Sequence, residues 1–561
     1  MVSGRPRRPT GGAAGAAGAS GAAGVLAVAV PAAVMLGLGL WGLDRGGTWR
    51  DEAVTLQVAR RSVPQIWRLL HEVDAVHGLY YLFMHAVLAV PGAGAVADEV
   101  LLRLPSVVAA SAAAGLVAAL GSRLARPRVG LWAGLLYAVT PMVGHYAQEG
   151  RSYALVAAGA AGATLWLAKA VDGRRPWWPY AVLVAGTGLL HELAVLMLPA
   201  HAVTLALARV ARREWGRWAA AAGGALLVVS PLALVSGRQA GQVAWLTPPD
   251  AGAALRLLWR FTGRADGALW VYLGLVVVAA TAPRRSALVR VALPLAVLPP
   301  LLLMALSQVR PMYDDRYVLF ALAGAPLLAA AGADRLLGAL PRAGTAAGAR
   351  AVALVGGSAV ALAFVGQLPL HRLDRDPGSR PDNLTAVAAL AARELAPGDQ
   401  VVFLPSIGRR PALAYPRAFR RARDLALKTP GPASGTLYGV EADAPVLRRR
   451  LAAVDRLWVV AEPYVLRSRW YPGDPAERLK LTVVNEEFVP REPRREFVSG
   501  GTVLRLYVRR PAAAGPPRTG PAGPFPAGWS SAGPPRVAPP AGGPATGSRV
   551  SPPALPRPGP W

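Results

Sequence analysis

Repeated apolar runs of roughly 20 residues constrain this chain more than any other feature of its sequence. Because an α-helix rises about 1.5 Å per residue, a run of this length crosses a hydrocarbon core of roughly 30 Å. The pattern therefore predicts a mainly α fold, a polytopic membrane helix bundle of about eleven spans. The expected spans are 25–43, 102–121, 129–145, 153–170, 178–191, 193–210, 218–236, 267–282, 288–306, 317–337 and 350–366.

The composition excludes several classes of function. The formal net charge is +29, but the arginines lie between the apolar runs and in the last third of the chain rather than in one stripe. This distribution argues against a nucleic-acid partner and for basic loops that set membrane topology. There is no cysteine, which excludes a disulfide framework and thiolate chemistry. The preference for Arg, Ala, Gly and Pro points to a GC-rich bacterium.

Basic clusters between the runs indicate how the spans are oriented, because Lys and Arg concentrate in cytoplasmic loops. Placing all five clusters inside requires that 178–210 folds as a hairpin and that 80–90 does not cross. In the alternative, 80–90 crosses and 123–128 lies outside. We favour the first arrangement, in the plasma membrane with a cytoplasmic N-terminus. The clusters are Arg123/Arg126/Arg128, Lys169 with Arg174/Arg175, Arg212/Arg213/Arg217, Arg284/Arg285/Arg290 and Arg335/Arg342/Arg350.

This orientation gathers five segments on the outer face of the membrane. Four of them carry ionisable residues next to apolar runs, where charge is costly and usually serves function. The segments are 44–101, 145–152, 191–192, 237–266 and 307–316.

The chain divides into four parts. We expect a disordered cytoplasmic start (1–24), a transmembrane domain (25–370), an extracytoplasmic α/β domain (371–510) and a disordered Pro/Gly-rich tail (511–561). In the α/β domain, Asn383 caps a helix that runs to Leu395. The other expected elements are strands 401–404 and 457–461, a helix at 445–453, and strand-like 479–484 and 502–508.

Two adjacent carboxylates, Asp51 and Glu52, directly follow the first span. A carboxylate that is partly shielded from water can serve as a general base. Alternatively, Thr48-x-x-Asp51 matches a capping box, and Asp51 would then only begin a surface helix. The spacing alone does not decide between the two.

Further along this loop, Ser62-x-x-Gln65 predicts a short capped helix with Trp67 at headgroup depth. It forms either one wall of a site or a simple interfacial anchor. His77, Tyr80 and Tyr81 follow, and such aromatic residues are usually belt residues at an interface.

The turn at 145–153 combines Gln148, Glu149, Arg151 and Tyr153. The planar fork of Arg151 suits a phosphate, and Glu149 could bind a cation or hold the arginine. A structural ion pair between Glu149 and Arg151 is the competing interpretation.

Two smaller polar clusters complete the outer face. His191-Glu192 is a weak metal signal and more typical of a hairpin tip. The cluster Asp315-Arg316-Tyr317 suits a charged head group or an interfacial charge belt.

The order of these features resembles the polytopic glycosyltransferases with the GT-C fold. The nearest group is family 39, which includes bacterial protein-mannosyltransferase-like members and aminoarabinose transferases. The resemblance covers about 25–370 and departs from many relatives at Gly78, where they have proline. It is carried by Asp51-Glu52, His77-x-Leu-Tyr80-Tyr81, Arg103-Leu-Pro-Ser106, Gln148-Glu-x-Arg-x-Tyr153 and Asp315-Arg316-Tyr317.

The resemblance implies transfer of a sugar, mannose by default, from a polyprenyl-phosphate carrier to a protein, lipid or polysaccharide acceptor, with inversion. Asp51 would be the base, and Glu52 would orient it or the acceptor. We expect Arg151 and Arg316 to clamp the phosphate and Trp67, Tyr80 and Tyr81 to form walls for sugar or lipid. A divalent cation stays open. The rivals are a transporter or flippase and a non-catalytic envelope-assembly protein.

Overall fold

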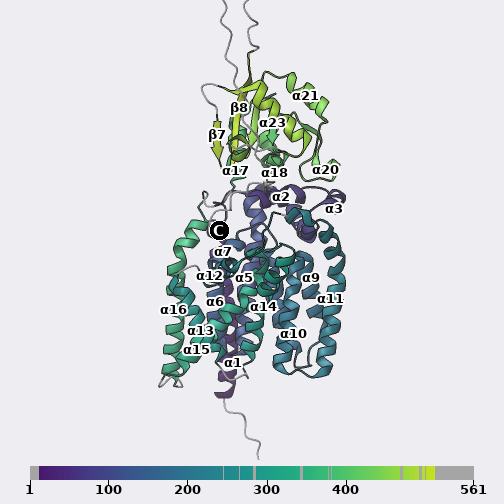
Figure 1. Ribbon diagram of the computed structural model, residues 1–561. Coiled ribbons are helices and arrows are strands. Elements are labelled where there is room, and N and C mark those ends of the chain that lie inside the picture. Colours follow the sequence, from purple (N-terminus) through teal and green to yellow (C-terminus); the bar gives the residue numbers. More distant parts are fainter. Residues whose placement is uncertain are drawn as a thin grey trace, which may run out of the picture.

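The computed structural model describes residues 12–511 except 244, 264–265, 282–285, 341–344, 377, 379, 381, 468–471, 492–495 and 500. Figure 1 shows a helical bundle with a smaller α/β domain stacked on one end. The predicted mainly α fold with a C-terminal α/β domain is therefore confirmed. The expected tail from 512 onward, and residues 1–11 of the expected start, lie outside the described residues.

Every predicted apolar run overlaps a helix of the bundle. Seven of the described helices are long and apolar enough to cross a membrane, or eight if the bent pair α12–α13 is one span. The others, α6, α9 and α10, are shorter than a full crossing. The bundle consists of α1 (Gly12–Leu40), α5 (Asp98–Leu124), α6 (Pro127–Val139), α7 (Pro141–Ala147), α8 (Tyr153–Ala170), α9 (Trp178–Leu190), η3 (Glu192–Leu196), α10 (Met197–Ala208), α11 (Arg212–Arg238), η4 (Ala240–Val243), α12 (Ala251–Thr262), α13 (Asp266–Ala280), α14 (Ala287–Val309), η5 (Asp315–Ala323), α15 (Gly324–Gly338) and α16 (Ala346–Asp374).

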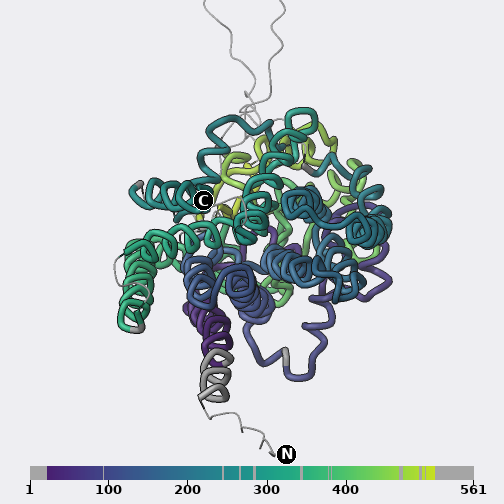
Figure 2. Tube along the Cα trace, turned by 90° about the horizontal axis from the view of Figure 1, so that it is seen from below, coloured from purple at the N-terminus to yellow at the C-terminus, as the bar shows by residue number. Residues whose placement is uncertain are grey.

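Helix α1 begins at Gly12, inside the segment 1–24 for which the sequence predicts disorder. Alanine has the highest helix propensity of all residues, which offsets the glycines among it. Seen along the bundle from the end opposite the α/β domain, α1 and α16 stand at the edge (Figure 2). Both bury little of their surface, as expected for helices that face lipid.

The chain folds back between α9 and α10, as the topology prediction requires. Tyr180, near the start of α9, contacts His201 in α10 with 2.8 Å between hydroxyl and ring nitrogen. His191, at the end of α9, lies against Tyr317 instead. The break falls at His191, whose extended backbone ends the helix.

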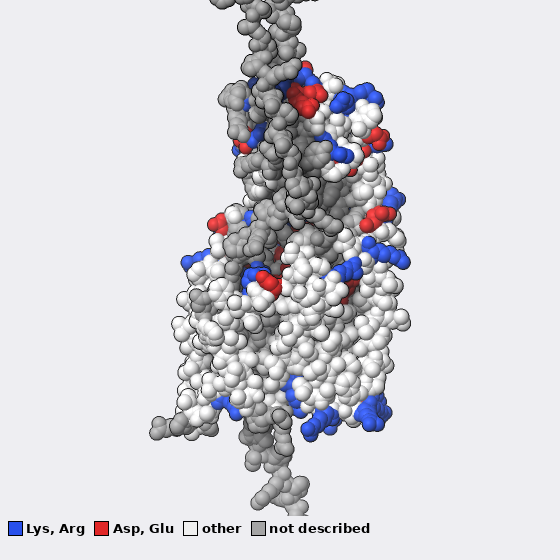
Figure 3. Space-filling view, viewed as in Figure 1, with Lys and Arg blue, Asp and Glu red and all other residues white. Residues whose placement is uncertain are grey.

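The predicted basic residues that the structure describes lie at the end of the bundle opposite the α/β domain, whereas Arg284, Arg285 and Arg342 lie outside the described residues. Arg123 pairs with Asp172 at 3.3 Å, which joins the α5–α6 and α8–α9 loops. Arg128 pairs with Asp334 at the end of α15 at 2.6 Å. In Figure 3 this lower end shows Lys and Arg without acidic side chains.

Three short helices form the predicted first outer loop: α2 (Arg50–Ala59), α3 (Val63–Glu72) and α4 (Gly78–Leu88), with η1 (Ala75–His77) and η2 (Ala93–Ala95) between and after them. Ser62 and Gln65 cap α3 as expected, and Trp67 is 63% exposed. Helix α4 has 11 residues, about 16 Å, which is too short to cross a bilayer.

The α/β domain contains a mixed sheet in the order β2-β1-β5-β8-β6, with β7 against β8. Strands β2, β1 and β5 are parallel, whereas β6 and β7 run antiparallel to β8, and β8 to β5. Asn383 caps α17 through the amide of Ala386, as predicted. The elements are α17 (Leu384–Glu394), β1 (Gln400–Leu404), η6 (Ser406–Arg409), α18 (Arg410–Ala414), α19 (Pro416–Phe419), β2 (Arg423–Asp424), β3 (Leu427–Thr429), α20 (Gly431–Ser434), β4 (Val440–Glu441), α21 (Ala444–Ala452), β5 (Arg456–Ala461), α22 (Pro463–Arg467), α23 (Pro475–Glu487), β6 (Phe488–Pro490), β7 (Glu496–Ser499) and β8 (Thr502–Arg509).

One element of this domain was predicted wrongly. Residues 479–484 belong to helix α23 and not to a strand. Asp474 accepts from the amides of Ala476 and Glu477, and Pro475 occupies the first helical position. This N-terminal signal outweighs the strand-like alternation that follows it.

Candidate active site

The carboxylate of Asp51 lies between two guanidinium groups at the end of the bundle that carries the α/β domain. Its Oδ2 is 3.1 Å from Nη1 of Arg316 and 3.5 Å from Nη2 of Arg151. The three residues come from α2, from the turn before α8 and from the start of η5. The structure therefore brings together the three groups to which the sequence assigns base and phosphate clamps.

Asp51 stays ionised in this setting. Burial favours its neutral form, but the charges of Arg151 and Arg316 outweigh burial and hold the pKa of Asp51 below its usual value. Its side chain remains 23% exposed, so a ligand can reach it.

Arg316 is fixed by more than one contact. Its Nε pairs with Asp314 at 3.3 Å, and its guanidinium lies over the rings of Tyr153 and Tyr317 at 5.7 and 5.6 Å. Such stacking orients a planar guanidinium without consuming its N–H donors. The stacked guanidinium thus holds Nη1 of Arg316 toward Asp51.

Glu52 points the other way, into the protein. It is fully buried and accepts two hydrogen bonds of 2.8 Å from Arg103, one of 3.1 Å from Arg380 and one of 2.9 Å from the amide of Gly150. Burial raises its pKa, but the two arginines reverse this and lower the pKa of Glu52 to about 2. With its lone pairs occupied, Glu52 cannot orient an acceptor directly; it can position Asp51 only through α2.

The capping-box alternative for Asp51 is wrong. Helix α2 begins at Arg50 after the cap residue Trp49, so the third helical position belongs to Glu52. Thr48 instead shares a hydrogen bond of 2.6 Å with Tyr415 of the α/β domain. Asp51 is therefore free of the capping role.

In the 148–152 turn, Gln148 and Glu149 have different surroundings. Gln148 donates to the carbonyls of Gly39 and Trp41, both at 2.8 Å, which ties the turn to the end of α1. Glu149 is 3.7 Å from His145, and its buried Oε1 has no hydrogen-bond partner among the described residues. Burial raises the pKa of Glu149 to about 7. The predicted Glu149–Arg151 ion pair is not formed, because Arg151 pairs with Asp51.

An aromatic cluster stands beside the two arginines. The rings of His191 and Tyr317 are 4.8 Å apart, those of Tyr153 and Tyr317 6.2 Å, and those of His77 and His191 6.2 Å. Burial, together with the nearby charge of Arg151, lowers the pKa of His77 well below its ordinary value. The structure therefore brings His77, Tyr153 and Tyr317 together in one cluster, with His77 as a neutral ring, and their predicted binding of a substrate stays a prediction.

Other predicted residues make no hydrogen bond or ion pair with Asp51 in the described part of the chain. Tyr80 and Tyr81 are fully buried in the packing of α4, and Tyr81 donates to Asp74, so neither forms the wall of an open site. Asp315 pairs with Arg260 of α12 at 3.1 Å. Burial of Tyr80 and Tyr81 therefore does not fit the predicted walls for sugar or lipid, whereas the role predicted for the exposed Trp67 stays a prediction.

The expected outer segments converge here. Besides the contacts of Asp51, Gln239 accepts from the amide of Ala75 and donates to the carbonyl of Leu70, both at 2.9 Å.

No group of three or more His, Cys, Asp or Glu side chains is placed to share a metal ion in the part of the chain that the structure describes. The described side chains therefore give no support for a divalent-cation site, and the cation stays an open question.

Sequence reasoning assigned no role to Arg103 or Arg380, although they hold Glu52. Arg103 stands one residue after an apolar pair inside a span, which is a signal for a buried partner. Arg380 carries no such signal, because it follows the last span in a polar stretch.

Residues 81–233, from α4 to α11, match the family described as Dolichyl-phosphate-mannose-protein mannosyltransferase. No curated protein matches the chain. Its structure is similar to ArnT from Cupriavidus metallidurans in the apo state, with a TM-score of 0.56 and 13% identity over 85% of this chain and 97% of ArnT. The chain has the GT-C glycosyltransferase fold.

ArnT bound to undecaprenyl phosphate matches the GT-C chain equally well, with a TM-score of 0.55, 14% identity, and the same 85% and 97% coverage. The Archaeoglobus fulgidus oligosaccharyltransferase gives a TM-score of 0.45 at 10% identity, over 85% of this chain and 72% of that one.

Proposed function

We propose that this GT-C protein is a membrane glycosyltransferase that moves a sugar from a polyprenyl-phosphate carrier to a hydroxyl group of an extracytoplasmic acceptor, with inversion. The observation that carries the proposal is the ionised, partly exposed Asp51 between the guanidiniums of Arg151 and Arg316. A transporter would place such charges along a path near the membrane midplane. Here they gather at one end of the bundle.

The arrangement suits an inverting displacement. Asp51 accepts the proton of the acceptor hydroxyl, the acceptor oxygen bonds to the anomeric carbon, and the bond from that carbon to the phosphate oxygen breaks. Arg151 and Arg316 neutralise the phosphate as it leaves. Prearranged cations of this kind contribute about 10²–10³ in rate each, and a general base about 10²–10⁴.

Donor binding would also make Asp51 a better base. In the free protein the two guanidiniums hold the pKa of Asp51 low. A phosphate that takes over their N–H donors weakens their hold on the carboxylate, so its pKa rises when the donor is in place. The base is then released only when there is a sugar to transfer.

The comparisons support the choice of donor. ArnT binds undecaprenyl phosphate, and the matched family is described as using dolichyl-phosphate-mannose. Both are polyprenyl phosphates, and mannose is our first choice of sugar. The basic end of the bundle supports a cytoplasmic placement for that end, which leaves Asp51 and the α/β domain outside the plasma membrane.

The test is transfer from radiolabelled polyprenyl-phosphate-mannose to envelope fractions by purified protein. Asp51→Asn should reduce transfer by at least about 10², whereas Asp98→Asn, a carboxylate whose pair with Arg60 is 35% exposed, should not. Arg151→Ala and Arg316→Ala should also weaken binding of the carrier lipid. Unaltered transfer by Asp51→Asn would refute Asp51 as the base, and an absence of transfer by the wild-type protein would leave the assembly-protein alternative.

A further inference from the structure

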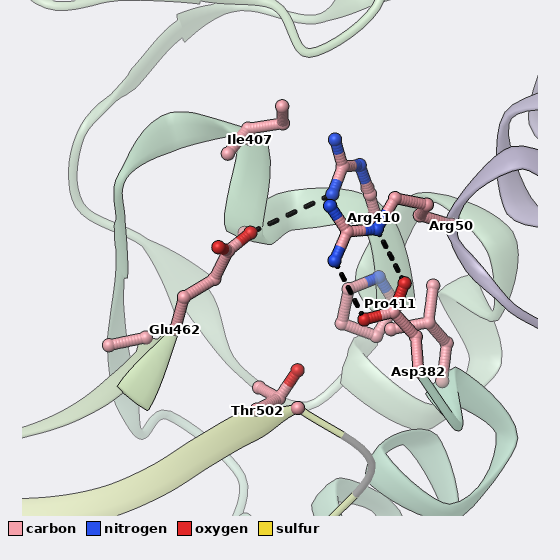
Figure 4. A pocket seen from close by; sticks show the side chains of 11 residues that line it. Arg50, Asp382, Ile407, Arg410, Pro411, Glu462 and Thr502 are labelled. Atoms are coloured by element: carbon pink, nitrogen blue, oxygen red, sulfur yellow. Dashed lines mark hydrogen bonds and ion pairs between the residues drawn. The ribbon is translucent and has the colours of Figure 1, made fainter. Parts of the chain in front are cut away.

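A small crevice lies between helix α2 and the α/β domain. Helix α2 supplies Arg50 to one side of it, and the other sides are the loops that follow β1 and β5 (Figure 4). The cavity has a volume of about 20 Å³, which is room for a single water. Its polar lining consists of Arg50, Asp382, Arg410, Glu462 and Thr502.

The crevice has the position at which open α/β sheets bind ligands. The strand order is β2-β1-β5, so the chain passes from β1 to β2 on one side of β1 and later returns to form β5 on the other side. The switch point therefore lies between β1 and β5. Ligands bind outside the carboxyl ends of parallel strands at such a switch point. Arg410 follows β1 and Glu462 follows β5, so both stand at this point.

A buried charge network holds the loop after β1 in place. Arg409, 2% exposed, pairs with Asp424 at 2.6 Å and with Glu441 at 2.8 Å. Lys480 donates to Glu441 and to the carbonyl of Phe403 at the end of the strand. Since Arg409 is anchored inward, its neighbour Arg410 is presented to the crevice.

The charges of the crevice are balanced. Arg50 bonds Asp382, with 3.0 Å between Nη2 and Oδ1, and Arg410 is 3.7 Å from Glu462. The second distance is too long for a hydrogen bond, so these two groups can part for a ligand. An anion in the crevice would be repelled by the two carboxylates, and a cation would be repelled by the two arginines. The hydroxyl groups of a neutral polyol can accept hydrogen bonds from the arginines and donate hydrogen bonds to the carboxylates.

The crevice and the base are adjacent. Arg50 precedes Asp51 on α2, and consecutive Cα atoms are about 3.8 Å apart. The charge of Arg410 also contributes to the low pKa of Asp51, so it acts within electrostatic reach.

We propose that this crevice binds the hydroxyl-bearing edge of a neutral saccharide and thereby makes a sugar the acceptor of the reaction. This assignment rests on the proposed function and narrows its acceptor to a glycan. Binding in the crevice directs a neighbouring hydroxyl of the same glycan toward Asp51.

Binding is measured by saturation-transfer difference NMR on the full chain in nanodiscs. The probes are neutral methyl glycosides of mannose, galactose and arabinose, with glucuronic acid and glucosamine as charged counterparts. Wild type and Asp51→Asn should saturate at least one neutral glycoside, and Arg410→Gln and Glu462→Gln should lose at least about 80% of that signal. Asp443→Asn, an exposed carboxylate of the same domain, is the matched control and should bind as wild type.

Transfer assays separate this proposal from the proposed function. Arg410→Gln should raise KM for the saccharide acceptor about tenfold with KM for the donor lipid unchanged. Equal binding by wild type and both crevice variants, preference for a charged sugar, or no saturation of neutral glycosides would overturn the proposal. Saccharide binding in the crevice without any turnover of the donor would refute the proposed transferase activity and support the proposed saccharide site.

Discussion

Replacing Glu52 with Gln should destabilise the protein by about 3 kcal/mol at neutral pH. Burial opposes the ionised form of Glu52, yet the bonds from Arg103 and Arg380 lower its pKa from 4.5 to about 2. At about 1.4 kcal/mol per pKa unit, that fall corresponds to about 3 kcal/mol. Removal of one partner from a buried ion pair costs about 3–5 kcal/mol by mutation, which agrees.

The stabilisation by Glu52 depends on pH in a direction that follows from its lowered pKa. Because the folded pKa of Glu52 lies below the unfolded value, its contribution is complete above about pH 4.5 and is lost as the pH falls toward 2. The assay is the free energy of unfolding in mixed micelles with SDS, for wild type and Glu52→Gln. Their difference should shrink from about 3 kcal/mol at pH 7 to about half that or less at pH 3.

Two outcomes would refute the reasoning about Glu52. One is an equal destabilisation at both pH values, which would mean that the loss comes from packing and not from charge. The other is a loss in the control Asp98→Asn as large as in Glu52→Gln, since a pair that is 35% exposed should contribute at most about 1 kcal/mol.

Two further predictions concern the site. Arg316→Lys keeps the charge but loses the planar fork that reaches Asp51 and stacks on Tyr153, so kcat should fall about 10²-fold, and a wild-type kcat would contradict this role. Burial raises the pKa of Glu149 from 4.5 to about 7, so its contribution to stability is complete below about pH 4.5 and is lost as the pH rises through 7. Glu149→Gln should therefore flatten the decline in unfolding free energy between pH 5 and 8, and an unchanged decline would count against the raised pKa.

Sequence patterns were sufficient to predict the bundle and to place Asp51, Arg151 and Arg316 on one face of it. Each of these residues stands at the end of an apolar run, and the basic loops require those ends to share one face. Topology therefore brings them together without any knowledge of how the helices pack. The strands of the α/β domain were predictable for a similar reason, because β1 and β5 are short apolar runs bounded by turns.

Side-chain direction could not be predicted in the same way. Tyr80 and Tyr81 fit an interfacial belt as well as a buried core, and only the packing of α4 against α2 decides for the core. Helix α23 was missed because Lys480 lies among apolar residues, as in a strand, yet its ammonium group is buried against Glu441 and Glu477. Glu441 is far from Lys480 in sequence, and Glu477 lies three residues before it, a spacing that an alternating strand pattern does not test.

The first turn of α2 shows why Asp51 and Glu52, although adjacent in sequence, do not act as a pair of catalytic acids. Successive residues of a helix rotate by about 100° around its axis, so neighbours in sequence face different surroundings. Arg50 bonds Asp382 at the crevice, Asp51 meets the two arginines of the site, and Glu52 enters the buried network with Arg103. One helical turn thus connects the α/β domain, the reacting space and the core of the bundle.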